Sequence, residues 1–94
     1  MYVTWDPAKA RSNYIKHGVD FADAAVALED ENALTILDNR QNEIRFKTLA
    51  RSPDSQVLLI VHAEQDEDTI RIISARRAER AEERQYFEGD RYGD

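Results

Sequence analysis

Ninety-four residues allow one domain with a thin core and a large share of surface. Cysteine is absent, which excludes disulfides, thiolate nucleophiles and cysteine-ligated metal sites. The segment from Met1 to Lys16 holds no apolar run typical of a signal peptide, and the longest apolar stretch, Val57 to Val61, is too short to span a bilayer. We therefore expect a cytoplasmic protein that does not bind membranes, with residues 1–94 forming a single domain.

The net charge of −6 argues against a nucleic-acid ligand, because polyanions bind basic surfaces. The charges are unevenly distributed, however, since acidic blocks at residues 19–39 and 52–68 alternate with basic blocks at residues 1–18 and 40–51. A folded domain could gather the basic segments into one patch and leave the acids elsewhere.

The N-terminal third predicts one strand and two helices. Tyr2 to Trp5 is rich in aromatic and β-branched residues and is predicted to form a short strand. Asp6 then offers an N-cap with proline at the first helical position, so a helix is expected over Pro7–His17. Gly18 would end it in the left-handed conformation. A second capping aspartate begins a helix that covers roughly Phe21–Glu29.

The rest of the chain predicts four strands and a final helix. The strands are expected at Leu34–Leu37, Glu43–Leu49, Gln56–Ala63 and Thr69–Ala75, with turns at 39–42, 52–55 and 65–68. Gln56–Ala63 is nearly all apolar, as expected of a central strand covered on both faces. From Ser74 or Ala75 onward, the composition favours a helix to about Phe87. The order β-α-α-β-β-β-β-α implies an α+β fold, an antiparallel β-meander with helices packed on one face.

The strand at residues 43–49 alternates in character. Ile44 and Phe46 should face one side, and Glu43, Arg45 and Lys47 the other. An acid between two cations suits a scissile phosphate, since guanidinium donors can clamp its oxygens. The same pattern also fits a solvated face with cross-strand ion pairs. Taken alone, the strand favours this second interpretation.

The segment around the last predicted strand is a second candidate. Arg71 lies among isoleucines, so its charge requires a partner. Arg76 and Arg77 fall where strand is expected to pass into helix, and free N–H groups there would add to anion binding. Alternatively, Arg71 pairs with Glu43 or with an acid of the last turn. The sequence leaves both interpretations open.

The two histidines predict different environments. His17, next to Lys16, lies in the last turn of a helix, where a protonated imidazole is favoured and could act as a general acid near neutrality. It could equally complement the helix end without a further role. His62 is expected in the core with one hydrogen bond. The histidines are far apart in sequence, with no carboxylate at ligand spacing, so no metal site is predicted.

These features occur together in an order that resembles the BrnT family of bacterial type II toxins, from Trp5 to about Phe87. The residues that carry the resemblance are Trp5-Asp6-Pro7-Ala8-Lys9, Asn13, Lys16-His17-Gly18-Val19, Phe21, Ala24, Glu43-Ile44-Arg45-Phe46, Arg71-Ile72-Ile73-Ser74-Ala75-Arg76, Glu83-Arg84 and Tyr86. The blocks Lys-His-Gly-Val-x-Phe and Arg-Ile-Ile-Ser-Ala-Arg, at this separation, are specific.

The resemblance implies a RelE-like fold and an endoribonuclease that needs no metal or cofactor, cleaves RNA and inhibits translation and growth. It also implies neutralisation by a BrnA-type antitoxin, whose ribbon-helix-helix part makes the contact to operator DNA. By matched positions and sequence pattern, the predicted catalytic residues are His17, Glu43, Arg45 and Arg76, and the predicted substrate-binding residues are Lys16, Lys47, Arg71, Ser74, Arg77 and Tyr86.

We interpret the roles as follows: Arg45 and Arg76 hold the phosphate, and Glu43 or His17 exchanges protons with the ribose 2′-hydroxyl and the leaving oxygen. The sequence departs from the family at Gln65, where relatives often carry a basic residue, and at the acidic loop that follows. Together with the isoelectric point near 4.9, this motivates an alternative: a catalytically weakened homologue that binds the antitoxin and tunes repression.

Overall fold

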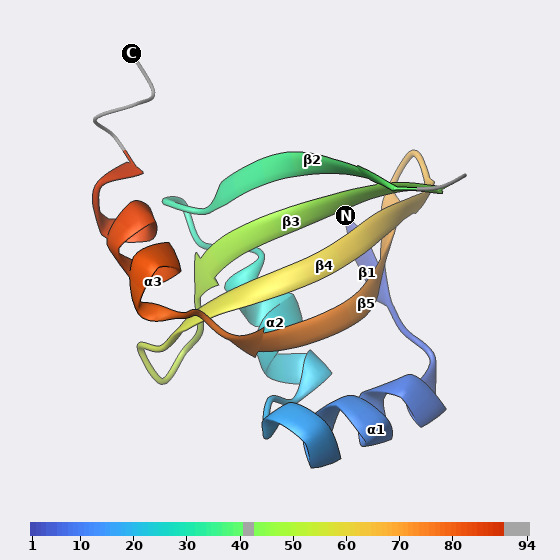
Figure 1. Ribbon diagram of the computed structural model, residues 1–94. Coiled ribbons are helices and arrows are strands. Elements are labelled where there is room, and N and C mark those ends of the chain that lie inside the picture. Colours follow the sequence, from blue (N-terminus) through green and yellow to red (C-terminus); the bar gives the residue numbers. More distant parts are fainter. Residues whose placement is uncertain (41–42, 90–94) are drawn as a thin grey trace.

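The computed structural model describes residues 1–40 and 43–89. Its elements follow the predicted order β-α-α-β-β-β-β-α (Figure 1). They are β1 (Tyr2–Thr4), α1 (Pro7–His17), α2 (Phe21–Ala27), β2 (Leu34–Arg40), β3 (Glu43–Arg51), β4 (Val57–Asp66), β5 (Thr69–Arg77) and α3 (Arg80–Phe87). Residues 41–42 of the turn predicted at 39–42 lie outside the described residues, and the two residues before them belong to β2.

The strands form one mixed sheet in the order β1-β5-β4-β3-β2. From β2 to β5 the sheet is the predicted antiparallel meander, and β1 adds at one edge, parallel to β5 (Figure 1). The predicted α+β class is therefore confirmed, with one parallel strand pair added to the meander.

The helix boundaries follow from local chemistry. Asp6 and Asp20 each cap a helix, their carboxylates accepting the backbone N–H two residues on at 2.9 and 3.0 Å. Gly18 ends α1 at φ 70°, a conformation that costs glycine little. No helix in the described part of the chain is long and apolar enough to cross a membrane.

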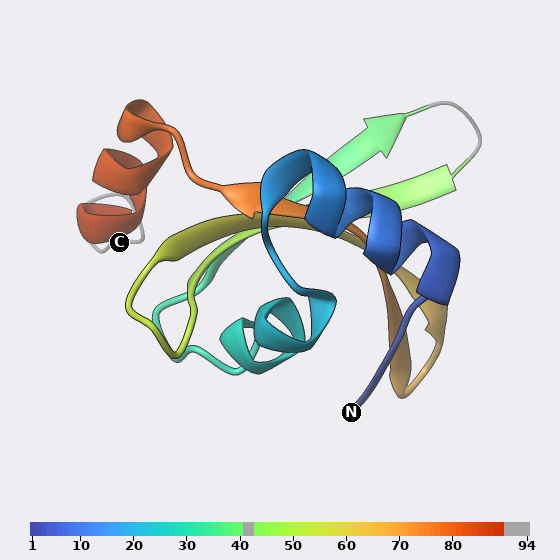
Figure 2. The same ribbon diagram turned by 90° about the horizontal axis from the view of Figure 1, so that it is seen from below.

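The helices lie on both faces of the sheet, so the expectation of one covered face is wrong. Helices α1 and α2 cover one face around a core that includes Phe21, Ile60 and Ile72. On the other face Tyr86 of α3 packs against Leu49 and Val57. Figure 2 shows α3 at one end of the sheet, apart from α1 and α2. Because β3 and β4 carry apolar residues on both sides at this end, each face offers a surface on which a helix can pack.

The start of the last helix is also corrected. Residues 74–77 pair with residues 58–61 of β4, so β5 continues to Arg77 and α3 begins only at Arg80. Ladder hydrogen bonds here override helix propensity. The free backbone N–H groups of a helix start, expected beside Arg76 and Arg77, therefore lie at the start of α3 instead. Strands β2 and β4 end at Arg40 and Asp66, later than predicted.

Strand β4 is covered on both faces only where α3 lies. Its Leu58 and Ile60 are buried under α2, whereas Leu59 and Val61 on the opposite face are only half-buried. The expectation of a strand covered throughout is therefore wrong. The face that carries Leu59 and Val61, called the open face below, is partly accessible beyond the edge of α3.

The two hairpins separate beyond the middle of the sheet. Pairing of β3 with β4 ends at Phe46 and His62, although β3 continues beside β2 to Glu43 and β4 continues beside β5 to Asp66. Figure 2 shows the β2–β3 hairpin diverging from the β4–β5 hairpin. An opening in the sheet therefore lies next to the first residues of β3.

Candidate functional site

Most of the predicted site residues share the open face. Directly paired residues of neighbouring strands point to the same side of a sheet. Lys47 of β3 pairs with Val61 of β4, which in turn pairs with Ser74 of β5. Two residues along β4 from Val61, Leu59 pairs with Arg76 and lies on the same face. Arg45 precedes Lys47 by two residues and lies on the same face. The fold thus brings cations from β3 and β5 onto one surface.

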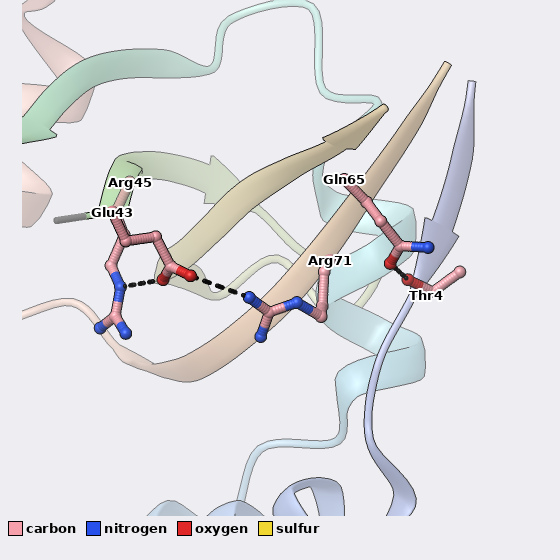
Figure 3. Close-up of polar contacts among 5 residues, drawn as sticks. All are labelled: Thr4, Glu43, Arg45, Gln65 and Arg71. Carbon is pink, nitrogen blue, oxygen red and sulfur yellow. Dashed lines mark hydrogen bonds and ion pairs between the residues drawn. The ribbon is translucent and has the colours of Figure 1, made fainter. Parts of the chain in front are cut away.

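Glu43 joins two of the predicted arginines (Figure 3). Its carboxylate accepts from Arg45 Nε at 2.7 Å and from Arg71 Nη2 at 3.2 Å. Arg71 therefore pairs with Glu43, one of the two partners that the sequence left open. The hydrogen bond from Arg45 lowers the pKa of Glu43 below its ordinary value, and the charges of Arg45, Arg71 and Lys9 add to this against a partial desolvation. Glu43 is consequently ionised at neutral pH.

A cavity of about 450 Å³ opens beside Glu43, where the two hairpins separate. Phe46, Gln65 and Arg71 also line it. The Oε1 atom of Gln65 accepts from Thr4 Oγ1 at 3.1 Å, which ties β4 to β1 (Figure 3). Glu43 and Arg71 therefore line this cavity, and Arg45 reaches it through its bond to Glu43.

A second ion pair lies further along the open face. Arg76 donates through Nη1 and Nη2 to the two carboxylate oxygens of Glu82 in α3, both at 2.9 Å. This bond lowers the pKa of Glu82 and raises that of Arg76. Lys47 Nζ lies 3.9 Å from Asp38 of β2. Sequence reasoning missed both carboxylate partners, although the Glu-x-x-Glu spacing of a capping box marks Glu82 as an ordered side chain.

Three of the predicted site residues are not part of the cluster of charges on the open face. Lys16 and His17 end α1, and no hydrogen bond or ion pair joins them to Glu43, Arg45 or Arg76 in the described part of the chain. Arg77 pairs with Leu58, so its side chain lies on the face that α1 and α2 cover.

Tyr86 has a structural contact of its own. It is buried, and its hydroxyl donates to Asp30 Oδ2. Burial, reinforced by the bond to Asp30, raises the pKa of Tyr86 to about 12. Burial alone would raise the pKa of Asp30, but the bonds from Tyr86 and from two backbone N–H groups outweigh it, so that pKa is lowered. Tyr86 thus fastens α3 to the loop after α2.

His62 lies in the core, as predicted. Its Nε2 atom is 2.8 Å from Thr48 Oγ1, and its ring stacks on Phe46. Burial lowers its pKa. In the described residues, no group of three or more histidine, aspartate or glutamate side chains is arranged to hold a metal ion.

Comparisons with known proteins concern the family and the fold of the chain. A sequence model of the family described as "ribonuclease toxin, BrnT, of type II toxin-antitoxin system" matches residues 5–82. The fold is similar to the crystal structure of the Brucella abortus ribonuclease toxin BrnT, with a TM-score of 0.64 and 22% identity over 85% of this chain and 99% of that chain. No curated protein sequence matches this chain significantly.

Proposed function

Since the chain belongs to the BrnT family of ribonuclease toxins of type II toxin–antitoxin systems, we propose that it cleaves RNA at its open face without a metal ion. One observation carries the proposal: the ionised carboxylate of Glu43 is held between Arg45 and Arg71 and lines a cavity. This arrangement sets a proton acceptor beside two donors for phosphate oxygens.

The proposed reaction needs no protein nucleophile. The ribose 2′-hydroxyl oxygen attacks the adjacent phosphorus, and the bond from phosphorus to the 5′-oxygen breaks. The products are a 2′,3′-cyclic phosphate and a free 5′-hydroxyl. A base removes the proton of the 2′-hydroxyl, and an acid gives a proton to the 5′-oxygen. The charge that builds on the phosphate oxygens requires fixed donors.

The structure supports particular residues for these roles. Glu43 is the candidate base, because its ionised carboxylate lies beside the two arginines that would bind the phosphate. Arg45 and Arg76 offer donors for phosphate oxygens, and Arg71, Lys47 and Ser74 share the open face with them. His17 is the other residue predicted to exchange protons, and with Glu43 as the base it is left as the candidate acid. The end of α1 is a favourable place for a cation, but no contact in the described residues connects it to the cluster.

The family also implies an antitoxin partner. We propose a BrnA-type antitoxin that neutralises the toxin and makes the operator contact through a ribbon-helix-helix part. Release from it would let RNA cleavage inhibit translation and growth in the cytoplasm.

The test uses the purified chain and an oligoribonucleotide. Cleavage should persist in excess EDTA and yield a 2′,3′-cyclic phosphate end. Arg45→Ala and Arg76→Ala should each lower kcat/KM by about a hundredfold, the scale of losing a transition-state donor. Arg11→Ala, which removes an exposed cation of α1, should cleave like the wild type. No cleavage by the folded wild-type chain, or loss of cleavage in EDTA, contradicts the proposal.

A second candidate function has its own support. Arg45, Arg71, Lys47 and Arg76 each pair with a carboxylate of the same chain, which lowers the attraction of this face for RNA. The protein would then be a weakened homologue that binds the antitoxin and tunes repression. A stable complex with the antitoxin, together with normal growth when the chain is expressed alone, would select this function.

A further inference from the structure

Arg76 keeps one pair of hydrogen-bond donors unused. A guanidinium carries five N–H donors in one rigid plane. Nη1 donates to Glu82 and, at 3.1 Å, to the backbone oxygen of Arg77, and Nη2 donates once to Glu82. No described residue accepts from Nε or from the second N–H of Nη2. These two donors lie side by side on one edge of the plane, a spacing that matches two oxygens of a phosphate.

This unused edge is accessible. Among the side chains of residues 1–38 and 43–89, His62 Nδ1 is the one buried polar atom without a partner. The unpaired Nε of Arg76 is therefore in contact with solvent, and the Arg76 side chain is 34% exposed. An anion on this edge would not have to displace Glu82 or the backbone oxygen of Arg77 from the guanidinium.

Glu82 is itself held in place. Its Oε1 atom accepts the backbone N–H of Glu79 at 2.8 Å, at the start of α3. Its side chain is only 23% exposed. The capping bond and the partial burial restrict the rotamers of this carboxylate. Its two-point bond therefore orients the guanidinium of β5 relative to α3.

We propose that Glu82 is a positioning residue for the RNA phosphate: it takes the terminal donors of Arg76 and presents the Nε–Nη2 edge to the substrate. The inference rests on the proposed function and adds to it a role for α3. Its rival is competition, in which the Glu82 carboxylate occupies the place of the phosphate on Arg76. The two make opposite predictions, because loss of Glu82 slows cleavage under positioning and speeds it under competition.

Glu82→Gln separates this role from the fold of α3. Glutamine serves at this capping position as glutamate does, so it keeps an acceptor for Glu79 and the helix should remain folded. It loses the charged two-point bond to Arg76. Glu83→Gln is the matched control, because it removes the same charge from an exposed neighbour on the same helix. We expect kcat/KM to be about tenfold lower for Glu82→Gln than for Glu83→Gln, with unchanged circular dichroism and melting temperature.

Coupling to Arg76 provides the second measurement. In an Arg76→Ala background, Glu82→Gln should cause no further loss, because no guanidinium is left to orient. Cleavage by Glu82→Gln that equals or exceeds that of Glu83→Gln would overturn the inference. An undiminished further loss in the Arg76→Ala background would overturn it too.

Binding distinguishes failure of the inference from failure of the proposed function. The probe is a 2′-O-methyl oligoribonucleotide, which cannot react because its 2′-oxygen is blocked. Its binding is measured by fluorescence anisotropy. If the wild type binds it but cleaves no RNA, the proposed reaction fails, and weaker binding by Glu82→Gln than by Glu83→Gln still supports positioning. No binding by the wild type rejects positioning, and so does equal binding by both variants when their kcat/KM values are equal too.

Discussion

The two faces of the sheet use polar side chains in different ways. On the covered face, Asn13 and His62 are buried, and they bond to backbone groups and to a buried hydroxyl. On the open face, Arg45 and Lys47 are partly exposed and pair with carboxylates that they could exchange for other anions. Buried polar bonds contribute mainly to stability, whereas exposed ion pairs contribute little to it. The comparison predicts that substitutions on the covered face change stability and those on the open face change activity.

The largest expected effect on stability is at Asn13. Its amide donates to Ala75 O at 2.8 Å and to Val19 O at 3.1 Å, and its oxygen accepts from Ala75 N at 3.1 Å. The side chain thus pairs with β5 where β1 has ended. Asn13→Ala would leave buried backbone groups unpaired and should lower the free energy of unfolding by about 3 kcal/mol.

Urea denaturation measures this loss. Ser12→Ala is the neighbouring control, because its hydroxyl bonds on the exposed side of α1, and it should stay within about 0.5 kcal/mol of the wild type. Equal losses for both variants would show that the stability of the covered face does not depend on the hydrogen bonds of Asn13.

Acid should destabilise the covered face through His62. Burial lowers its pKa in the folded state below the ordinary 6.5, so the unfolded chain binds the proton more readily. The contribution to stability is present above pH 6.5 and is lost as the pH falls through the folded pKa. His62→Leu should therefore show a shallower loss of stability between pH 7 and pH 5 than the wild type, measured by urea denaturation. A parallel dependence in both proteins would contradict the assignment.

Local signals predicted much of the covered face. Asp6, Gly18 and Asp20 act on residues next to them, so capping chemistry alone located α1 and the start of α2. The core position of His62 followed from its apolar strand. The end of β5 could not be predicted in this way, because residues 74–77 are held as strand by pairing with the distant residues 58–61.

The open face was predicted less completely. Alternation placed Arg45 and Lys47 on one side of β3, and the family resemblance selected Arg71 and Arg76. The partners Asp38 and Glu82 depend on strand register and on the position of α3, which no local pattern encodes. The RelE-like classification, the single domain over residues 1–94 and the individual site roles stay predictions.

Tyr86 tests the division between the faces, because this residue of α3 is buried although it packs on the same side of the sheet as the open face. Tyr86→Phe keeps the ring and loses the bond to Asp30, so the free energy of unfolding should fall by about 1 kcal/mol. The raised pKa gives a second measurement. Stability from the protonated hydroxyl is present below pH 10 and is lost as the pH rises towards 12.

The variant should therefore lose less stability than the wild type between pH 10 and pH 12. Tyr14→Phe, at an exposed position, should behave as the wild type does in both measurements. If instead Tyr86→Phe changes RNA cleavage without changing stability, Tyr86 belongs with the open face and its predicted substrate role gains support.

The smallest effect is expected at Lys47. Its 3.9 Å pair with Asp38 is partly exposed, so Lys47→Ala should change the free energy of unfolding by less than about 0.5 kcal/mol. If the open face binds RNA, the loss should appear instead in the salt dependence of binding. The slope of log affinity against log salt concentration should decrease by about 1, as expected for one lost phosphate contact. An unchanged slope combined with a clear loss of stability would show that Lys47 is a structural residue. That result would contradict the prediction that substitutions on the open face change activity rather than stability.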